Sequence, residues 1–173
     1  MNEKIEQYVR NHGRDFMEWL CDIISIPSPT GHEQAKGEWI LNLLHQWGAA
    51  GAYRDAAGNV VYPCHVKSGE KVALYTAHID TVFQDLQEIH IRQTGHILSA
   101  PSCSDNSASI AGLLFIIKMF HDLQLTPPQG LLFAFDVGEE GLGNLKGMRQ
   151  VMADCHGRNA EVVAVDCTFD TFV

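Results

Sequence analysis

Apolar side chains recur every three or four positions in two segments near the start of the chain. Residues 5–24 follow this spacing, with a weak point at residues 11–13, and predict a first helix. Thr30 and Glu33 fit a capping box, in which side chains three residues apart bond the free amides of a helix start. A second helix is therefore expected from this box to about Trp47.

The same helical spacing returns later in the chain. Residues 105–123 predict a long helix, which Pro127-Pro128 prevents from continuing, and residues 145–152 predict a short one. Residues 88–98 predict a pair of short strands that turn around Thr94-Gly95. Helices and strands therefore alternate over the second half of the chain.

Four other segments have the composition of β-strands. Residues 59–66 and 71–77 are joined by the polar residues 67–70, and this arrangement predicts a hairpin. Residues 131–137 and 161–166 are almost continuously apolar, as in strands that are buried on both faces of a sheet.

This alternation predicts a three-layer α/β/α fold with a mixed, largely parallel sheet and helices on both faces. A length of 173 residues allows one domain and not two. In open sheets of this kind, ligands bind beyond the carboxyl ends of the strands, so candidate functional residues should be sought there.

Composition excludes several classes of protein. Hydrophobic residues make up 46% of the chain, and a net charge of −9 without a basic cluster argues against a nucleic-acid partner. The longest apolar run, residues 110–117, is too short to span a membrane, and residues 1–16 lack the apolar core of a secretion signal. We therefore expect no membrane contact and a cytoplasmic protein. The five cysteines form no Cys-x-x-Cys pair, which favours reduced thiols.

Acidic and histidine residues gather where predicted strands end or a predicted helix begins. Each of these residues, taken alone, has an ordinary structural explanation, such as a hydrogen-bonded histidine at a strand end, a helix cap or a solvated turn. Together they would meet at one edge of the sheet. The candidates are His78, Asp80, Asp105, Glu139, Glu140 and Asp166.

One imidazole with several carboxylates and no thiolate suits divalent zinc, cobalt or manganese. Residues i and i+2 of a strand share a face, so a strand that reached Asp80 would let its carboxylate accept the second N–H of His78. Carboxylates gathered this closely would repel one another without cations, and two ions sharing one carboxylate could activate a water. A carboxylate that is not a ligand could then take the proton of that water.

Four motifs resemble the co-catalytic zinc peptidases, a family that includes tripeptidase (peptidase T), carboxypeptidase G, aminoacylase and succinyl-diaminopimelate desuccinylase. The resemblance runs from about residue 8 onward and includes the Pro-rich segment at residues 26–31. The motifs are Thr76-Ala77-His78-Ile79-Asp80-Thr81-Val82, Ser104-Asp105-Asn106-Ser107, Gly138-Glu139-Glu140-Gly141-Leu142-Gly143 and Val165-Asp166.

The resemblance implies a set of metal ligands. By analogy with the family, His78 and Asp166 would bind one zinc ion, Asp105 would bridge both ions, and Glu140 would bind the second. The sequence departs from the family around Asp105, where serines and a cysteine stand in place of the usual glycines.

The resemblance also implies a reaction. Members of the family hydrolyse a peptide or amide bond in small substrates, with the residue matching Glu139 as general base and the residue matching Asp80 orienting the ligand histidine. The sequence of residues 140–147 resembles the tripeptidase branch of the family more than the deacylases. The substrate is expected to be a small peptide or an N-acyl amino acid.

The family's enzymes are considerably longer than this chain. We therefore expect residues 1–173 to be the N-terminal portion of a catalytic domain, without the lid or dimerisation domain and without the C-terminal segment that carries a last histidine ligand. The first ion would keep three protein ligands and the second only two. Hydrolysis by the chain alone should be weak or absent, and uncovered apolar edges should favour a homo-oligomer.

Three alternatives remain open. The first is an N-acyl-amino-acid deacylase of the same family, and the second is a non-catalytic fragment that binds metal or a partner. The third is a serine hydrolase that uses Ser107 or Ser109, which the absence of a Gly-x-Ser-x-Gly motif makes the least favoured.

Overall fold

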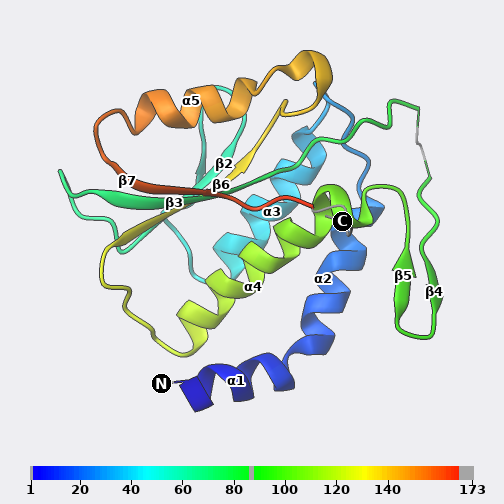
Figure 1. The fold of residues 1–173 in the computed structure, drawn as a ribbon, viewed down its shortest axis with the longest axis horizontal. Coiled ribbons are helices and arrows are strands. Elements are labelled where there is room, and N and C mark those ends of the chain that lie inside the picture. Colours follow the sequence, from blue (N-terminus) through cyan, green and yellow to red (C-terminus); the bar gives the residue numbers. More distant parts are fainter. Residues whose placement is uncertain (1, 86–87, 168–173) are drawn as a thin grey trace, which may run out of the picture.

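A computed structural model describes residues 2–85 and 88–167 and has the predicted three-layer α/β/α architecture (Figure 1). A central sheet has the strand order β1-β2-β6-β3-β7. Helices α2, α3 and α4 cover one face, where their apolar residues form the main core with strands β3 and β6, and α5 covers the other face. A separate two-stranded sheet, β4-β5, stands off at one side.

The helices and strands have the following bounds. The helices are α1 (Asn2–Asn11), α2 (Gly13–Ser25), α3 (Gln34–Gln46), α4 (Ser109–Asp122) and α5 (Lys146–Asp154). The strands are β1 (Tyr53–Arg54), β2 (Val60–Cys64), β3 (Val72–His78), β4 (Arg92–Thr94), β5 (Ile97–Ser99), β6 (Gly130–Asp136) and β7 (Asn159–Ala164). The strand pair predicted around Thr94-Gly95 is confirmed by β4 and β5. None of the described helices is long and apolar enough to cross a membrane.

The hairpin predicted between residues 59–66 and 71–77 is wrong. Strands β2 and β3 do not pair with each other, because β6 lies between them, antiparallel to β2 and parallel to β3. Every residue of β6 is buried, so this strand needs a partner on each of its edges as well as cover on both faces. A polar turn between two strands predicts that they are antiparallel but not that they are adjacent.

Parallel register sets the position of the site. Strand β3 pairs in parallel with β6 and β7, so all three end at the same edge of the sheet. His78, the last residue of β3, is the register partner of Asp136, the last residue of β6. The chain that continues beyond each of these ends therefore meets at one place.

The first predicted helix is two helices. His12 lies between α1 and α2 with non-helical angles (φ −111°, ψ 14°), and its Nδ1 lies 2.7 Å from Asp15 Oδ2. Its ring stacks on that of Tyr8, with a centroid distance of 4.1 Å, and the hydroxyl of Tyr8 donates to Asp122 of α4 over 2.8 Å. The polar residues that weaken the apolar spacing thus form a corner between helices.

The predicted capping box is also wrong. Helix α3 begins at Gln34, and among the described residues no side chain caps it. Thr30 Oγ1 donates instead to Asp80, and the carboxylate of Glu33 accepts the amide hydrogens of Gly31 and Gly138. Both side chains are directed to the end of the sheet rather than to their own helix.

The helix predicted from residue 105 begins four residues later, at Ser109. A π-helical segment, Cys103–Ala108, precedes it, and within this segment Asp105 (φ −107°, ψ 95°) and Asn106 (φ −126°, ψ 26°) are not helical. Asp105 is therefore free of the capping role that its position predicts, and it lies close to the carboxyl ends of the strands.

Candidate active site

The ring of His78 is almost completely buried, and both of its nitrogens have defined neighbours. Nδ1 lies 3.0 Å from the carbonyl oxygen of Asp80, and because a carbonyl can only accept, Nδ1 carries the hydrogen. In the neutral ring, Nε2 then presents a lone pair. That nitrogen lies 3.0 Å from Asp105 Oδ1 and 3.6 Å from Asp166 Oδ1.

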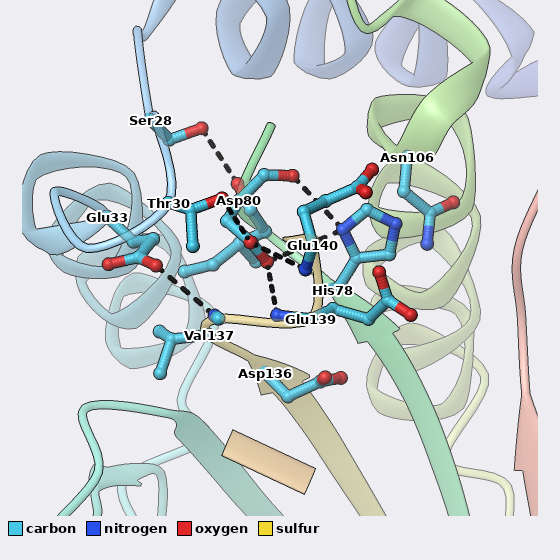
Figure 2. Close-up of polar contacts among 12 residues, drawn as sticks. Ser28, Thr30, Glu33, His78, Asp80, Asn106, Asp136, Val137, Glu139 and Glu140 are labelled. Atoms are coloured by element: carbon cyan, nitrogen blue, oxygen red, sulfur yellow. Dashed lines mark hydrogen bonds and ion pairs between the residues drawn. The ribbon is translucent and has the colours of Figure 1, made fainter. Parts of the chain in front are cut away.

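The carboxylate of Asp80 has a different role from the one predicted. Strand β3 ends at His78, so the two residues are not on one extended strand, and Oδ1 lies 3.6 Å from the ring nitrogen. The fully buried carboxylate instead accepts hydrogen bonds from the amides of Glu139 (2.9 Å) and Glu140 (3.0 Å) and from Thr30 Oγ1 (2.9 Å) (Figure 2). Burial alone would raise its pKa, but these donors and the nearby imidazole hold the pKa below its ordinary value.

Glu139 and Glu140 follow β6 after a turn at Gly138, whose φ of +62° is in the left-handed region that glycine tolerates. Both carboxylates point towards the ring of His78 (Figure 2). Burial raises the pKa of each glutamate, and the surrounding carboxylates raise it further, whereas His78 opposes the shift.

Asp105 faces this group from the segment before α4. Its Oδ1 is buried and has no hydrogen-bond partner among the described residues. The neighbouring Asn106 ties the segment to the end of β7, since its Nδ2 donates to the carbonyl of Val165 over 3.0 Å. Asp105 thus approaches His78 although the segment lacks the glycines typical of the resembling family.

Asp166 lies two residues beyond β7 and is about half exposed. One of its carboxylate oxygens accepts the amide hydrogen of Cys167 over 2.7 Å, and the same oxygen lies 3.6 Å from His78. All six predicted site residues are therefore at one end of the sheet. Among the described residues, two sets of three could each hold a metal ion, because the ligand atoms within each set all lie within 4.8 Å of one another. One set is His78, Asp105 and Asp166, and the other is His78, Glu139 and Glu140.

The electrostatics of the group favour a bound cation. Burial lowers the pKa of His78, but the carboxylates of Asp80, Asp166 and Glu139 outweigh it and raise the pKa to about 9. A proton or a metal ion between the imidazole and its acidic neighbours would offset the repulsion among the carboxylates. An imidazole nitrogen, several carboxylate oxygens and the unpartnered Asp105 Oδ1 fit a divalent zinc, cobalt or manganese ion.

Sequence reasoning missed three residues of the site. Thr30 and Glu33 support it, although their spacing predicts a helix cap. Asp136 is buried on the same face as His78 and accepts a hydrogen bond from Thr76 Oγ1. Burial raises the pKa of Asp136 to about 6. An acid inside an otherwise apolar strand was the signal that could have found it.

Two cavities lie beside the glutamates. The larger, of about 640 Å³, borders Glu140, and its lining includes Glu33, Arg54 and Lys146. The smaller, of about 100 Å³, is lined by the other side of the site, including His78 and Glu139. A substrate group could enter the larger cavity without displacing the side chains that meet at His78.

A buried imidazole and converging carboxylates at the carboxyl ends of parallel strands define a metal-dependent hydrolase type of site. The model of the peptidase family M20/M25/M40 matches residues 74–171, a segment that contains all six predicted site residues. The chain belongs to this family, and the predicted resemblance is confirmed.

One curated relative is the "Putative LysW-lysine/LysW-ornithine hydrolase" of Pyrococcus abyssi. It is 32% identical over 134 residues, which are 77% of this chain and 35% of the relative.

Solved structures share the fold. Human carnosine dipeptidase 1 matches with a TM-score of 0.76 and 14% identity, over 96% of this chain and 41% of that one. Aminopeptidase PepT from Bacillus cereus matches with a TM-score of 0.72 and 17% identity, over 89% and 43%. The chain thus spans about two fifths of the length of these proteins.

Proposed function

We propose that this site hydrolyses a peptide or amide bond in a small substrate with the help of two divalent metal ions, zinc being the first choice. The observation that carries the proposal is the geometry of His78. Its Nδ1–H is held by a carbonyl, and its Nε2 faces two carboxylates. One of these, Asp105, has a buried oxygen that makes no hydrogen bond within residues 2–85 and 88–167. This is the arrangement of a metal-ligand histidine with its orienting acceptor.

The proposed ligands divide into two sets. His78, Asp105 and Asp166 would hold the first ion, and Asp105 and Glu140 would hold the second. Three protein ligands at the first position against two at the second support tighter binding at the first. Bound metal ions would polarise the substrate carbonyl and lower the pKa of water.

Glu139 is the proposed general base. The family resemblance assigns it this role rather than that of a ligand, and its raised pKa suits a group that accepts a proton at one step and returns it at another. The oxygen of water bonds to the carbonyl carbon while Glu139 takes a proton from the water. When the C–N bond breaks, Glu139 returns that proton to the leaving nitrogen.

Glu139→Gln tests this proposal. The variant keeps the size of the side chain but cannot accept a proton, so hydrolysis of a tripeptide should fall by about 10²–10⁴-fold. Zinc affinity, measured by calorimetry, should remain that of the original chain. Unchanged hydrolysis in the variant would overturn the role of Glu139, and absence of zinc binding in the original chain would overturn the metal site.

A second candidate function is amide hydrolysis of an N-acyl amino acid. It is supported by the relative from Pyrococcus abyssi, whose name describes a hydrolase of LysW-lysine and LysW-ornithine. Parallel assays with a tripeptide and an N-acetyl amino acid separate the two. If the chain binds metal but turns over neither substrate, the non-catalytic alternative is favoured for residues 1–173.

Self-association is a further part of the proposal. Within the described residues, β7 pairs on one side only, with β3, and Val162 on this strand is 43% exposed. An open strand edge with apolar side chains can pair with another chain. PhTET1-12s, a solved structure with a similar fold, is described as a dodecamer. Light scattering that finds only monomer at all concentrations would contradict self-association.

A further inference from the structure

Asn59 lies immediately before β2, far from the site in sequence, and its side chain is completely buried. Its Oδ1 accepts the amide hydrogen of Val137 over 2.9 Å. Its Nδ2 donates to the carbonyl of Gly147 over 2.9 Å and to Asp55 Oδ2 over 2.6 Å. Both hydrogens and the oxygen of the amide are therefore used, so the group has one favourable orientation.

Two of these partners mark the ends of the loop that carries the glutamates. Val137 follows β6, and Gly147 is the second residue of α5. The ends are also bonded directly to each other, since the Gly147 amide donates to the Val137 carbonyl over 2.8 Å and the Lys146 amide donates to the Gly138 carbonyl over 3.1 Å. Asn59 joins this closed loop to the start of β2.

Gly147 packs so closely against Asn59 and Val137 that no side chain fits at position 147. A Cβ atom at Gly147 would lie 2.2 Å from Asn59 Oδ1 and 2.5 Å from the backbone nitrogen and oxygen of Val137. Atoms that are not bonded to each other cannot approach this closely, so any side chain at this position would move the loop away from Asn59. Gly147 is thus required by the close approach of three chain segments.

Asp55 determines which way the Asn59 amide faces. Its Oδ1 accepts the amide hydrogens of Ala57, Gly58 and Asn59 within 3.0 Å, and its Oδ2 accepts from Asn59 Nδ2. An aspartate at position 59 would keep the size of the side chain. However, it would set a carboxylate oxygen against Asp55 Oδ2 and the Gly147 carbonyl, where a donor is needed.

Asp80 binds the middle of the same loop through the amides of Glu139 and Glu140. We infer that Asn59 is a positioning residue for the glutamates: it fixes both ends of the loop, while Asp80 fixes the middle, so that both carboxylates converge on His78. Its importance for catalysis rests on the proposed function. Its effect on loop geometry does not.

Two variants test the inference, Asn59→Asp and Gly147→Ala. The first removes both hydrogen bonds that Asn59 Nδ2 donates, and the second forces the loop away from Asn59. Either variant alone can test the inference if the other does not fold. Tyr8→Phe is the control, because it removes a distant hydrogen bond to Asp122. Amide hydrogen exchange in the metal-free protein, zinc affinity by calorimetry, and kcat and KM are measured for each variant.

We expect exchange at the Glu139 and Glu140 amides to accelerate at least about 10-fold relative to Leu74 in β3, and zinc affinity to fall about 10–100-fold. The value of kcat should fall by a similar factor with KM little changed, and Tyr8→Phe should show none of these effects. Equal acceleration at Leu74 and Glu139, or unchanged zinc affinity, would overturn the inference. If the original chain binds zinc but hydrolyses nothing, the non-catalytic alternative is favoured for residues 1–173, while exchange and zinc affinity still decide the role of Asn59.

Discussion

The hydrogen bond that joins His78 to Asp80 is made with the main-chain carbonyl of Asp80, while the carboxylate lies farther from the ring, at 3.6 Å. The ring nitrogen donates to the carbonyl of Asp80 over 3.0 Å, and the carboxylate of Asp80 is thereby left to accept the amides of Glu139 and Glu140. One residue therefore connects the proposed ligand histidine to the loop with the proposed base. The two connections use different atoms, so substitution can separate them.

Asp80→Asn should weaken metal binding without turning the His78 ring. The asparagine keeps the main-chain carbonyl, but the amides of Glu139 and Glu140 are bonded to different carboxylate oxygens, and the Nδ2 that replaces one of these oxygens cannot accept. Zinc affinity measured by calorimetry should fall about 10–100-fold. Nitrogen NMR of His78 should still show the hydrogen on Nδ1. Zinc affinity equal to that of the original chain would contradict this role of Asp80.

Asp105→Asn and Glu140→Gln should affect metal binding differently. Asp105 belongs to both proposed ligand sets, whereas Glu140 belongs only to the second. A zinc titration of the original chain should therefore show one tight and one weak ion. Asp105→Asn should weaken both ions, and Glu140→Gln only the weak one. Two equally tight ions in the original chain would be inconsistent with the proposed division.

Asp136→Asn should stabilise the metal-free protein above about pH 6. Burial raises the pKa of Asp136 from 3.8 to about 6, so the folded state binds the proton more tightly than the unfolded state. Ionisation of this carboxyl therefore lowers the free energy of unfolding as the pH rises from about 4 to 6. Above pH 6 the loss stays constant. The penalty is about 3 kcal/mol at most. Urea unfolding of both proteins at pH 4 and pH 7.5 measures it. A gain at pH 4 equal to that at pH 7.5 would show that titration is not the cause.

Phe133→Ala should destabilise the whole fold. Phe133 is fully buried in β6, and its ring stacks between Tyr62 and Tyr75 at centroid distances of 6.4 and 5.9 Å. Loss of a buried phenylalanine side chain costs about 3–5 kcal/mol. Phe133→Leu, which retains most of the apolar volume, serves as the control in urea unfolding. A loss below about 1 kcal/mol for the alanine variant would mean that β6 is not the centre of the core.

The fold class and the candidate site residues can be predicted from the sequence because both are indicated by patterns among residues that are close together in the chain. Apolar spacing identifies the helices, and acidic residues after apolar runs identify the strand ends that meet in a parallel sheet. The order of the strands depends on contacts between distant segments. The insertion of β6 between β2 and β3 therefore has no local signature.

The residues that support the site could not be predicted from the sequence, because their roles also depend on contacts between distant segments. Thr30 and Glu33 have the spacing of a helix cap, and only the folded chain brings Asp80 and Gly138 close enough to compete for them. Asn59 has no unusual neighbours in sequence, since its partners lie 78 and 88 residues further along the chain. Residues that contact the substrate or a metal have recognisable chemistry, whereas those that hold them depend on geometry alone.

Along β3, side chains alternate between the layer of α5 and the layer of α2–α4. Leu74 packs with residues of α5, and Ala73 and Ala77 pack in the main core. If one residue were deleted within this strand and its start kept its register, the imidazole would turn towards the layer of α2–α4, and Ile79 would take the position that faces the acidic group. Whether the imidazole reaches the acidic group thus depends on whether the number of residues between the start of the strand and the histidine is odd or even. It does not depend on which apolar side chains fill the positions between them.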